Sequence, residues 1–211
     1  MPLAEKLAQK LLQIKAIKLS PQNPYTWASG LKSPIYCDNR VTLSFPEVRN
    51  LLVEGFIEKA KTISGVEVIA GVATAGIPHA TLVADRLNLP LVYIRSKAKA
   101  HGRKNVIEGQ LKEGAKVLVI EDLISTGGSS LQAVQDLRDA GAEVLATMAI
   151  FTYGFKRAEL AFEKANCPLL TLTNYDYLLK EAVESNYLDA KYLELLAQWK
   201  ADPEKWEGAN K

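Results

Sequence analysis

The chain has few of the features that mark secreted, membrane-spanning or nucleic-acid-binding proteins. It has only two cysteines, Cys37 and Cys167, which provide neither a disulfide framework nor a paired metal-ligand spacing. We therefore expect reduced thiols and a cytoplasmic location. No apolar run approaches the roughly 20 residues of a membrane span, and a formal net charge of +2 is too small to indicate bulk binding of nucleic acid. We expect no membrane and no nucleic-acid partner.

Two common nucleotide-binding motifs are also missing. The sequence has no Gly-x-Gly-x-x-Gly dinucleotide fingerprint. Gly71 and Gly76 have the spacing of a Walker A loop, but Ile77 and Pro78 stand where that loop requires Lys and Ser or Thr. These absences exclude the usual dinucleotide and P-loop sites, so a phosphate site must come from another motif.

What the chain does have is an alternation of strand and helix patterns in a sequence that is 48% hydrophobic. Such alternation indicates an α/β fold with a parallel sheet covered by helices on both faces. Ser44 and Glu47 have the spacing of a capping box before the second helix, and 18–43 should form loops and short strands. We predict strands at 66–72, 90–94, 117–120, 143–152 and 169–171, and helices at 2–17, 46–63, 77–87, 128–140, 155–165 and 187–199.

The most informative segment covers residues 117–130. A buried-strand pattern is followed by Glu121 and Asp122, and a Ser-Thr-Gly-Gly-Ser turn then leads into a helix. Carboxylates at a strand end can accept hydrogen bonds from sugar hydroxyls, directly or through Mg²⁺. The turn allows backbone N–H groups to converge on an anion at a helix N-terminus. The segment therefore predicts a site for a ribose 5-phosphate.

Two further loops are expected beside it, because ligands of open parallel sheets bind beyond the carboxyl ends of the strands. The loop from Arg95 to Gly109 is rich in Lys and Arg, and it carries one of the two histidines of the chain. It is long for a strand-to-helix connection and suits closure over a pyrophosphate. The turn from Ala73 to Gly76 has small side chains that let a ligand approach the backbone. We interpret the other histidine, His79, as structural.

Three motifs in this order resemble the orotate phosphoribosyltransferases, which belong to the type I phosphoribosyltransferases. They are Ser-Gly-Leu-Lys-Ser-Pro-Ile-Tyr-Cys-Asp-Asn-Arg at 29–40, Arg-Ser-Lys-Ala-Lys-Ala-His-Gly at 95–102 and Ile-Glu-Asp-Leu-Ile-Ser-Thr-Gly-Gly-Ser at 120–129. The resemblance covers nearly the whole chain. It implies a single domain over 1–211 with the type I fold, a central, mainly parallel sheet flanked by helices. About 1–45 would form an N-terminal helix and a small base-binding hood, and about 46–211 the α/β core and C-terminal helices.

The resemblance also implies a reaction and its site residues. The 5-phosphoribosyl group of phosphoribosyl pyrophosphate (PRPP) would pass to orotate, giving orotidine 5′-monophosphate and pyrophosphate in pyrimidine biosynthesis. The enzyme would be a homodimer with shared active sites. Mg²⁺ would be held through PRPP with Asp122 nearby, and not by the protein alone. The catalytic residues would be Arg95, Lys99 and His101, which contact PRPP together with Ala73, Thr74, Glu121, Asp122, Leu123, Ile124, Ser125, Thr126, Gly127, Gly128 and Ser129. The orotate contacts would be Ser125, Lys32 and Arg157.

The chain departs from the family pattern at three positions, since some members have lysine where it has Ala28, Ala75 and Ser96. Lys32 and Lys97 are candidates to replace those lysines. Two other functions stay open. A phosphoribosyltransferase for a purine or uracil is disfavoured by the aromatic N-terminal segment and the histidine-containing loop. A regulator that senses PRPP while binding nucleic acid is disfavoured by the low net charge and the lack of a helix-turn-helix signal.

Overall fold

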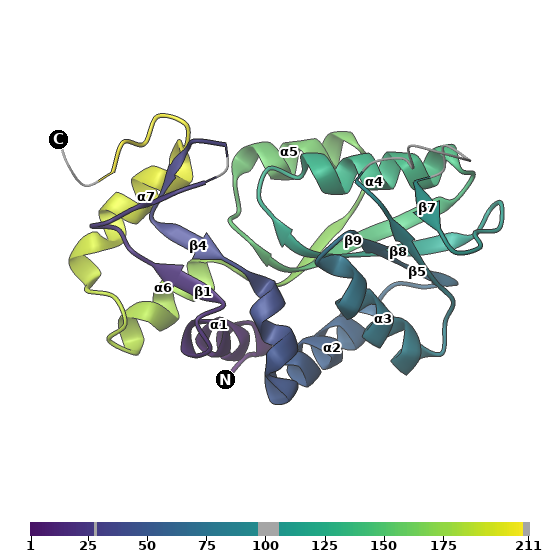
Figure 1. Ribbon diagram of the computed structural model, residues 1–211, viewed down its shortest axis with the longest axis horizontal. Helices are drawn as coiled ribbons and strands as arrows, with labels where there is room; N and C mark the ends of the chain where they lie inside the picture. Colours follow the sequence, from purple (N-terminus) through teal and green to yellow (C-terminus); the bar gives the residue numbers. More distant parts are fainter. Residues whose placement is uncertain (28, 97–105, 209–211) are drawn as a thin grey trace.

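The central feature of the fold is a six-stranded sheet with the strand order β10-β9-β8-β5-β6-β7 (Figure 1). The computed structural model describes residues 1–27, 29–96 and 106–208. All neighbouring strands run parallel except β7, which pairs antiparallel with β6. This confirms the predicted mainly parallel sheet. The strands are β5 (Val68–Val72), β6 (Leu91–Ile94), β7 (Ile107–Glu108), β8 (Lys116–Ile124), β9 (Glu143–Thr152) and β10 (Leu169–Asn174).

Helices cover both faces of this sheet, as predicted. Figure 1 shows α2 (Pro46–Ala60) and α3 (Gly76–Leu87) below it, and α4 (Gly128–Asp139) and α5 (Lys156–Lys164) above it. Each face buries its own apolar cluster, and β5 in the middle of the sheet is buried along its whole length. Burial on both faces explains why the central strands have nearly continuous apolar runs.

The N-terminal and C-terminal segments pack together at one end of the sheet (Figure 1). We call residues 1–45 and 175–208 together the hood, a larger unit than the small hood that the sequence predicted within about 1–45. The ring of Trp27 stacks on that of Tyr153 at 5.4 Å, and Trp199 meets both rings edge-on, which joins the hood to the end of β9. The hood contains α1 (Leu3–Gln13), β1 (Ile17–Leu19), β2 (Tyr25–Thr26), β3 (Lys32–Ser33), β4 (Ile35–Cys37), α6 (Tyr175–Glu184), α7 (Leu193–Ala201) and the 3₁₀ helices η1 (Asn39–Ser44) and η2 (Ala190–Tyr192).

Some details differ from the sequence-based predictions. The capping box was wrong, because Ser44 ends η1 and the N-cap position of α2 belongs to Phe45, which has no side-chain cap. Helix α6 and strand β7 were not predicted. Strand β8 extends to Ile124, so that Glu121 and Asp122 lie within it. No helix in the described ranges is both long and apolar enough to cross a membrane.

Glycine allows α3 to begin close against β8. A Cβ atom added at Gly76, the first residue of α3, would lie 2.6 Å from the backbone oxygen of Ile120. A contact this short cannot be relieved by a side-chain rotation, because the opposing atom belongs to a central strand. Only glycine therefore fits where the turn after β5 passes the end of β8.

Gly76→Ala should lower the free energy of unfolding by about 1–3 kcal/mol, the usual cost of overpacking. Gly128→Ala is the matched control, since Gly128 also begins a helix and an added Cβ would meet nothing within 4 Å. The control should leave stability unchanged or raise it slightly. Urea denaturation of both variants measures the difference, and equal losses would contradict the proposed contact.

Candidate active site

Three segments meet where the parallel strands end. The turn after β5 is tied to β6, because the backbone N–H of Ala73 donates to the Ile94 carbonyl at 2.8 Å. The same turn, in which the Ala73–Thr74 peptide is cis, leads into Gly76 beside the Ile120 carbonyl of β8. The turn, the end of β6 and the acidic end of β8 therefore lie at one sheet edge, as the sequence predicted.

The two carboxylates of β8 have different environments. Glu121 is 6% exposed, and its carboxylate accepts from the Ser130 hydroxyl and from the Asp122 N–H, each at 3.0 Å. Burial, followed by the charge of Asp122, raises the pKa of Glu121 from 4.5 to about 8. Asp122 is only half-buried, although burial also raises the pKa of its carboxyl group. Glu121 thus ties β8 to the start of α4, while Asp122 is the more exposed of the two carboxylates.

The turn between β8 and α4 has the form of an anion site. Gly127 occupies the N-cap position with φ 82°, and because it has no side chain it makes no capping hydrogen bond to the first turn of α4. Thr126, Gly128 and Ser129 are exposed in this turn. Uncapped N–H groups at a helix N-terminus bind anions well, especially beside hydroxyl groups. The turn can therefore receive a phosphate group next to the Asp122 carboxylate.

The hood contributes residues to which sequence reasoning gave no role. The side-chain amide of Asn39 donates to the backbone oxygen of Asp122 at 2.8 Å. Burial raises the pKa of the Cys37 thiol, and the charges of Asp122 and Asp38 raise it further. The end of β4 therefore lies against the acidic end of β8. The only sequence signal was that both residues belong to the first motif that resembles the family.

The other predicted site residues have varied positions. The Arg95 guanidinium forms an ion pair with Glu108 at 3.3 Å. The backbone N–H of Arg95 donates to the Val106 carbonyl at 2.9 Å, and the two contacts join the two ends of the basic loop. Lys32 donates to the Thr26 hydroxyl on β2 at 2.8 Å. Outside the described residues lie Ala28, Lys97, Lys99 and His101.

Arg157 and His79 are two further side chains of interest. Arg157 pairs with Glu204 and lies over the Phe155 ring, next to the C-terminal segment. A role of Arg157 in orotate binding stays a prediction. His79 is fully buried in α3, and burial lowers its pKa to about 4, so its imidazole is neutral at pH 7.

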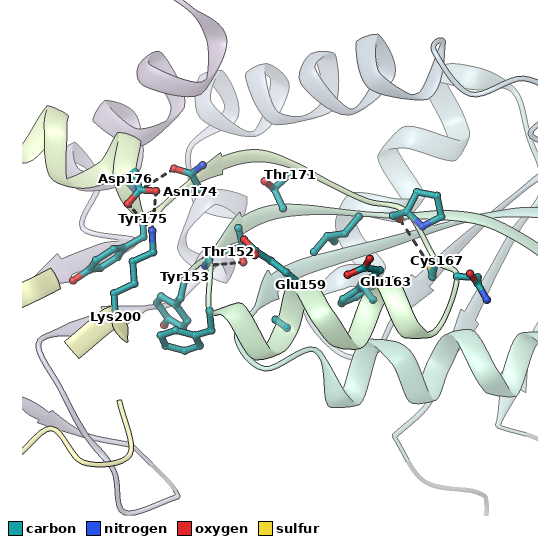
Figure 2. Close-up of a pocket in the computed structure, with 17 residues that line it drawn as sticks. Thr152, Tyr153, Glu159, Glu163, Cys167, Thr171, Asn174, Tyr175, Asp176 and Lys200 are labelled. Carbon is teal, nitrogen blue, oxygen red and sulfur yellow. Dashed lines mark hydrogen bonds and ion pairs between the residues drawn. The ribbon is translucent and has the colours of Figure 1, made fainter. Parts of the chain in front are cut away.

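A cavity of about 700 Å³ lies elsewhere, between α5 and β10 (Figure 2). Glu159 and Glu163 point into it from α5 and Thr171 from β10, while Lys200 closes one end through its ion pair with Asp176. Among the described residues, none that is predicted to bind PRPP or orotate lines this cavity. Although the cavity is large, its lining residues do not identify it as the PRPP site that the sequence predicts.

Comparison with known proteins agrees with the geometry of the strand ends. Residues 47–175 match the family model described as "Phosphoribosyl transferase domain". A protein of Listeria monocytogenes named orotate phosphoribosyltransferase is 55% identical over 207 residues, which cover 98% of this chain and 99% of that protein.

Solved structures show the same fold. The orotate phosphoribosyltransferase of Aeropyrum pernix superposes with a TM-score of 0.71 at 26% identity, covering 87% of this chain and 99% of that chain. The UMP synthase of Leishmania donovani gives a TM-score of 0.77 at 27% identity over 93% of this chain. The match spans 42% of the UMP synthase chain.

The raised pKa of Glu121 predicts how stability depends on pH in the ligand-free protein. Because the folded state favours the protonated acid, this stabilisation is complete below pH 4.5 and is lost as the pH rises through about 8. Stability should fall by on the order of 1 kcal/mol per pH unit in that window. Glu121→Gln stays neutral and should lose less between pH 6 and 9 in urea titrations. Parallel losses in the two proteins would show that Glu121 does not titrate there.

Proposed function

The chain belongs to the orotate phosphoribosyltransferase family, and from this we propose that it transfers the 5-phosphoribosyl group of PRPP to orotate. The products are orotidine 5′-monophosphate and pyrophosphate, as in pyrimidine biosynthesis. The observation that carries the proposal is the uncapped turn at the start of α4 directly after the half-buried Asp122. This pairing puts an anion site and a diol acceptor on one segment, as recognition of a ribose 5-phosphate requires.

Each part of this edge has a distinct task in the proposed reaction. The turn from Ser125 to Ser129 receives the 5′-phosphate on its N–H and hydroxyl groups. Asp122 accepts hydrogen bonds from the ribose hydroxyls and balances the positive charge that develops on the sugar as its C1–oxygen bond breaks. Glu121 accepts one hydrogen bond at each carboxylate oxygen, from the Asp122 N–H and from the Ser130 hydroxyl, and its remaining lone pairs would accept from a ribose hydroxyl.

The departing pyrophosphate gains negative charge, which cations must neutralise. We propose that Arg95, Lys99 and His101 do this, and that the backbone of Ala73 and Thr74 contacts the same group. In the ligand-free structure the Arg95 guanidinium is paired with Glu108. Arg95 would therefore have to exchange this partner for a phosphate oxygen, an exchange that its forked guanidinium group suits.

The donor set at this edge fits a magnesium ion bound together with PRPP. Mg²⁺ in phosphate sites is usually held by substrate oxygens, waters and one or two carboxylates. The Asp122 carboxylate is a donor of this kind, because it is half-buried at the end of β8. Bound there, the ion would supply charge neutralisation for the diphosphate.

The base would lie between the end of β8 and the hood. This placement is supported by the contact of Asn39 with Asp122, because it brings the end of β4 next to the residue whose carboxylate is proposed to bind the ribose. Ser125, Lys32 and Arg157 remain the proposed orotate contacts. The orotate nitrogen is already acidic, so a strong general base is not obligatory. We further propose a cytoplasmic homodimer in which each basic loop serves the neighbouring site.

An absorbance assay of orotate consumption tests the proposed function. Consumption should require PRPP and Mg²⁺ together and should release pyrophosphate in equal amount. Uracil and purine bases, added in place of orotate, should release none. Pyrophosphate release with uracil or a purine alone would favour another base, and PRPP binding without release would favour a sensor.

Asp122→Asn should weaken the binding of PRPP with Mg²⁺ by about 10- to 100-fold, because a charged acceptor for the ribose hydroxyls is lost. Calorimetric titration measures this affinity. Asp139→Asn is the control, since Asp139 is exposed at the far end of α4 and contacts Gln135. Unchanged affinity in Asp122→Asn would remove this carboxylate from the site.

A further inference from the structure

Asn39 forms the side-chain hydrogen bond that connects the hood to the acidic end of β8. It is fully buried at the start of η1, and its amide nitrogen donates to the Asp122 carbonyl at 2.8 Å. Its own carbonyl accepts from the Thr42 hydroxyl at 2.6 Å, which fixes its backbone. Asn39 is the first residue of η1, which connects β4 to α2. The side chain is therefore held at its base and bonded at its tip.

The end of β8 at Asp122, which accepts this hydrogen bond, has fewer strand contacts than the rest of β8. The pairing of β8 with β5 stops at Ile120, opposite Gly71, although β8 itself continues to Ile124. On the other side, β9 pairs with β8 as far as Ile124. Asp122 thus lies where the strand has lost one of its two neighbours, and the Asn39 amide supplies a hydrogen bond there.

Stability alone is a poor explanation for asparagine at this position. Within the described part of the chain, the side-chain oxygen of Asn39 is buried without a hydrogen-bond partner. An unsatisfied buried acceptor costs free energy that an apolar side chain of similar size would not. Buried polar groups that carry such a cost are often found at functional sites.

We propose that Asn39 is a positioning residue that fixes Asp122, and with it the ribose, at a set distance from the base-binding side of the hood. The inference rests on the proposed function and deepens it. Asn39 acts through its hydrogen bond to the Asp122 main chain. It lies two residues after Cys37, the last residue of β4. Because the reaction joins a base nitrogen to C1 of the ribose, a small error in this distance slows the transfer.

The test compares Asn39→Leu with a variant that loses an equivalent bond elsewhere. Thr173→Val is the matched control, because the buried Thr173 hydroxyl donates to the Ala4 carbonyl at 2.8 Å and also joins the N-terminal segment to the sheet. Asn39→Leu should weaken the binding of PRPP with Mg²⁺ and lower kcat/KM for orotate, each by about 10- to 100-fold, the scale known for groups that orient a ligating side chain. Thr173→Val should stay within about threefold of the wild type in both measurements.

Thermal unfolding of each variant accompanies these measurements. Equal losses of affinity and activity in the two variants, or unchanged PRPP affinity in Asn39→Leu, would overturn the positioning role. Should Asn39→Leu fail to fold, Asn39→Ala replaces it with the same expected results. If the wild type binds PRPP but does not consume orotate, the proposed function fails, and the calorimetric titration still decides the role of Asn39.

Discussion

The hydrogen bond between the buried Glu121 carboxylate and the Ser130 hydroxyl is the constraint on which the rest of the site depends. It joins the end of β8 to the first turn of α4, so that the turn between them has both ends fixed. A buried carboxylate is costly, and here the cost is reduced by two donors and by a pKa raised to about 8. Glu121 therefore fixes the shape of the turn, and Asp122 is the more exposed of the two acids.

Charge in this protein is balanced overall but distributed unevenly. The chain has 26 Lys and Arg residues against 24 Asp and Glu residues, which leaves no strong field over the whole surface. The cations that could bind pyrophosphate are concentrated in one loop, 95–104, whose base is closed by the pairing of Arg95 with Glu108. The carboxylates Glu121 and Asp122 stand on β8, which β5 separates from the strand β6 that precedes this loop. The proposed reaction would use both charges, because it separates a cationic sugar from an anionic leaving group.

The sequence predicted the sheet and the position of the turn between β8 and α4 because these depend on local patterns. Apolar runs, a Gly-Gly turn and helical spacing are visible without tertiary information. Helix α6 was missed because β10 leads into it at Asn174 without an intervening turn, and Asn174 itself caps it. The contact of Asn39 with Asp122 joins positions 83 residues apart, so no local pattern could indicate it. The same holds for the pairing of Arg157 with Glu204.

The hood and the sheet meet through two kinds of contact that differ in what they can transmit. Aromatic packing of Trp27, Tyr153 and Trp199 is non-directional, and it tolerates small shifts of one ring over another. The Asn39 hydrogen bond is directional, and a displacement of half an ångström weakens it. The first therefore supplies adhesion, and the second sets the register between the hood and the end of β8. A transfer between two bound substrates needs both, because adhesion without register leaves the reacting atoms near each other but misaligned.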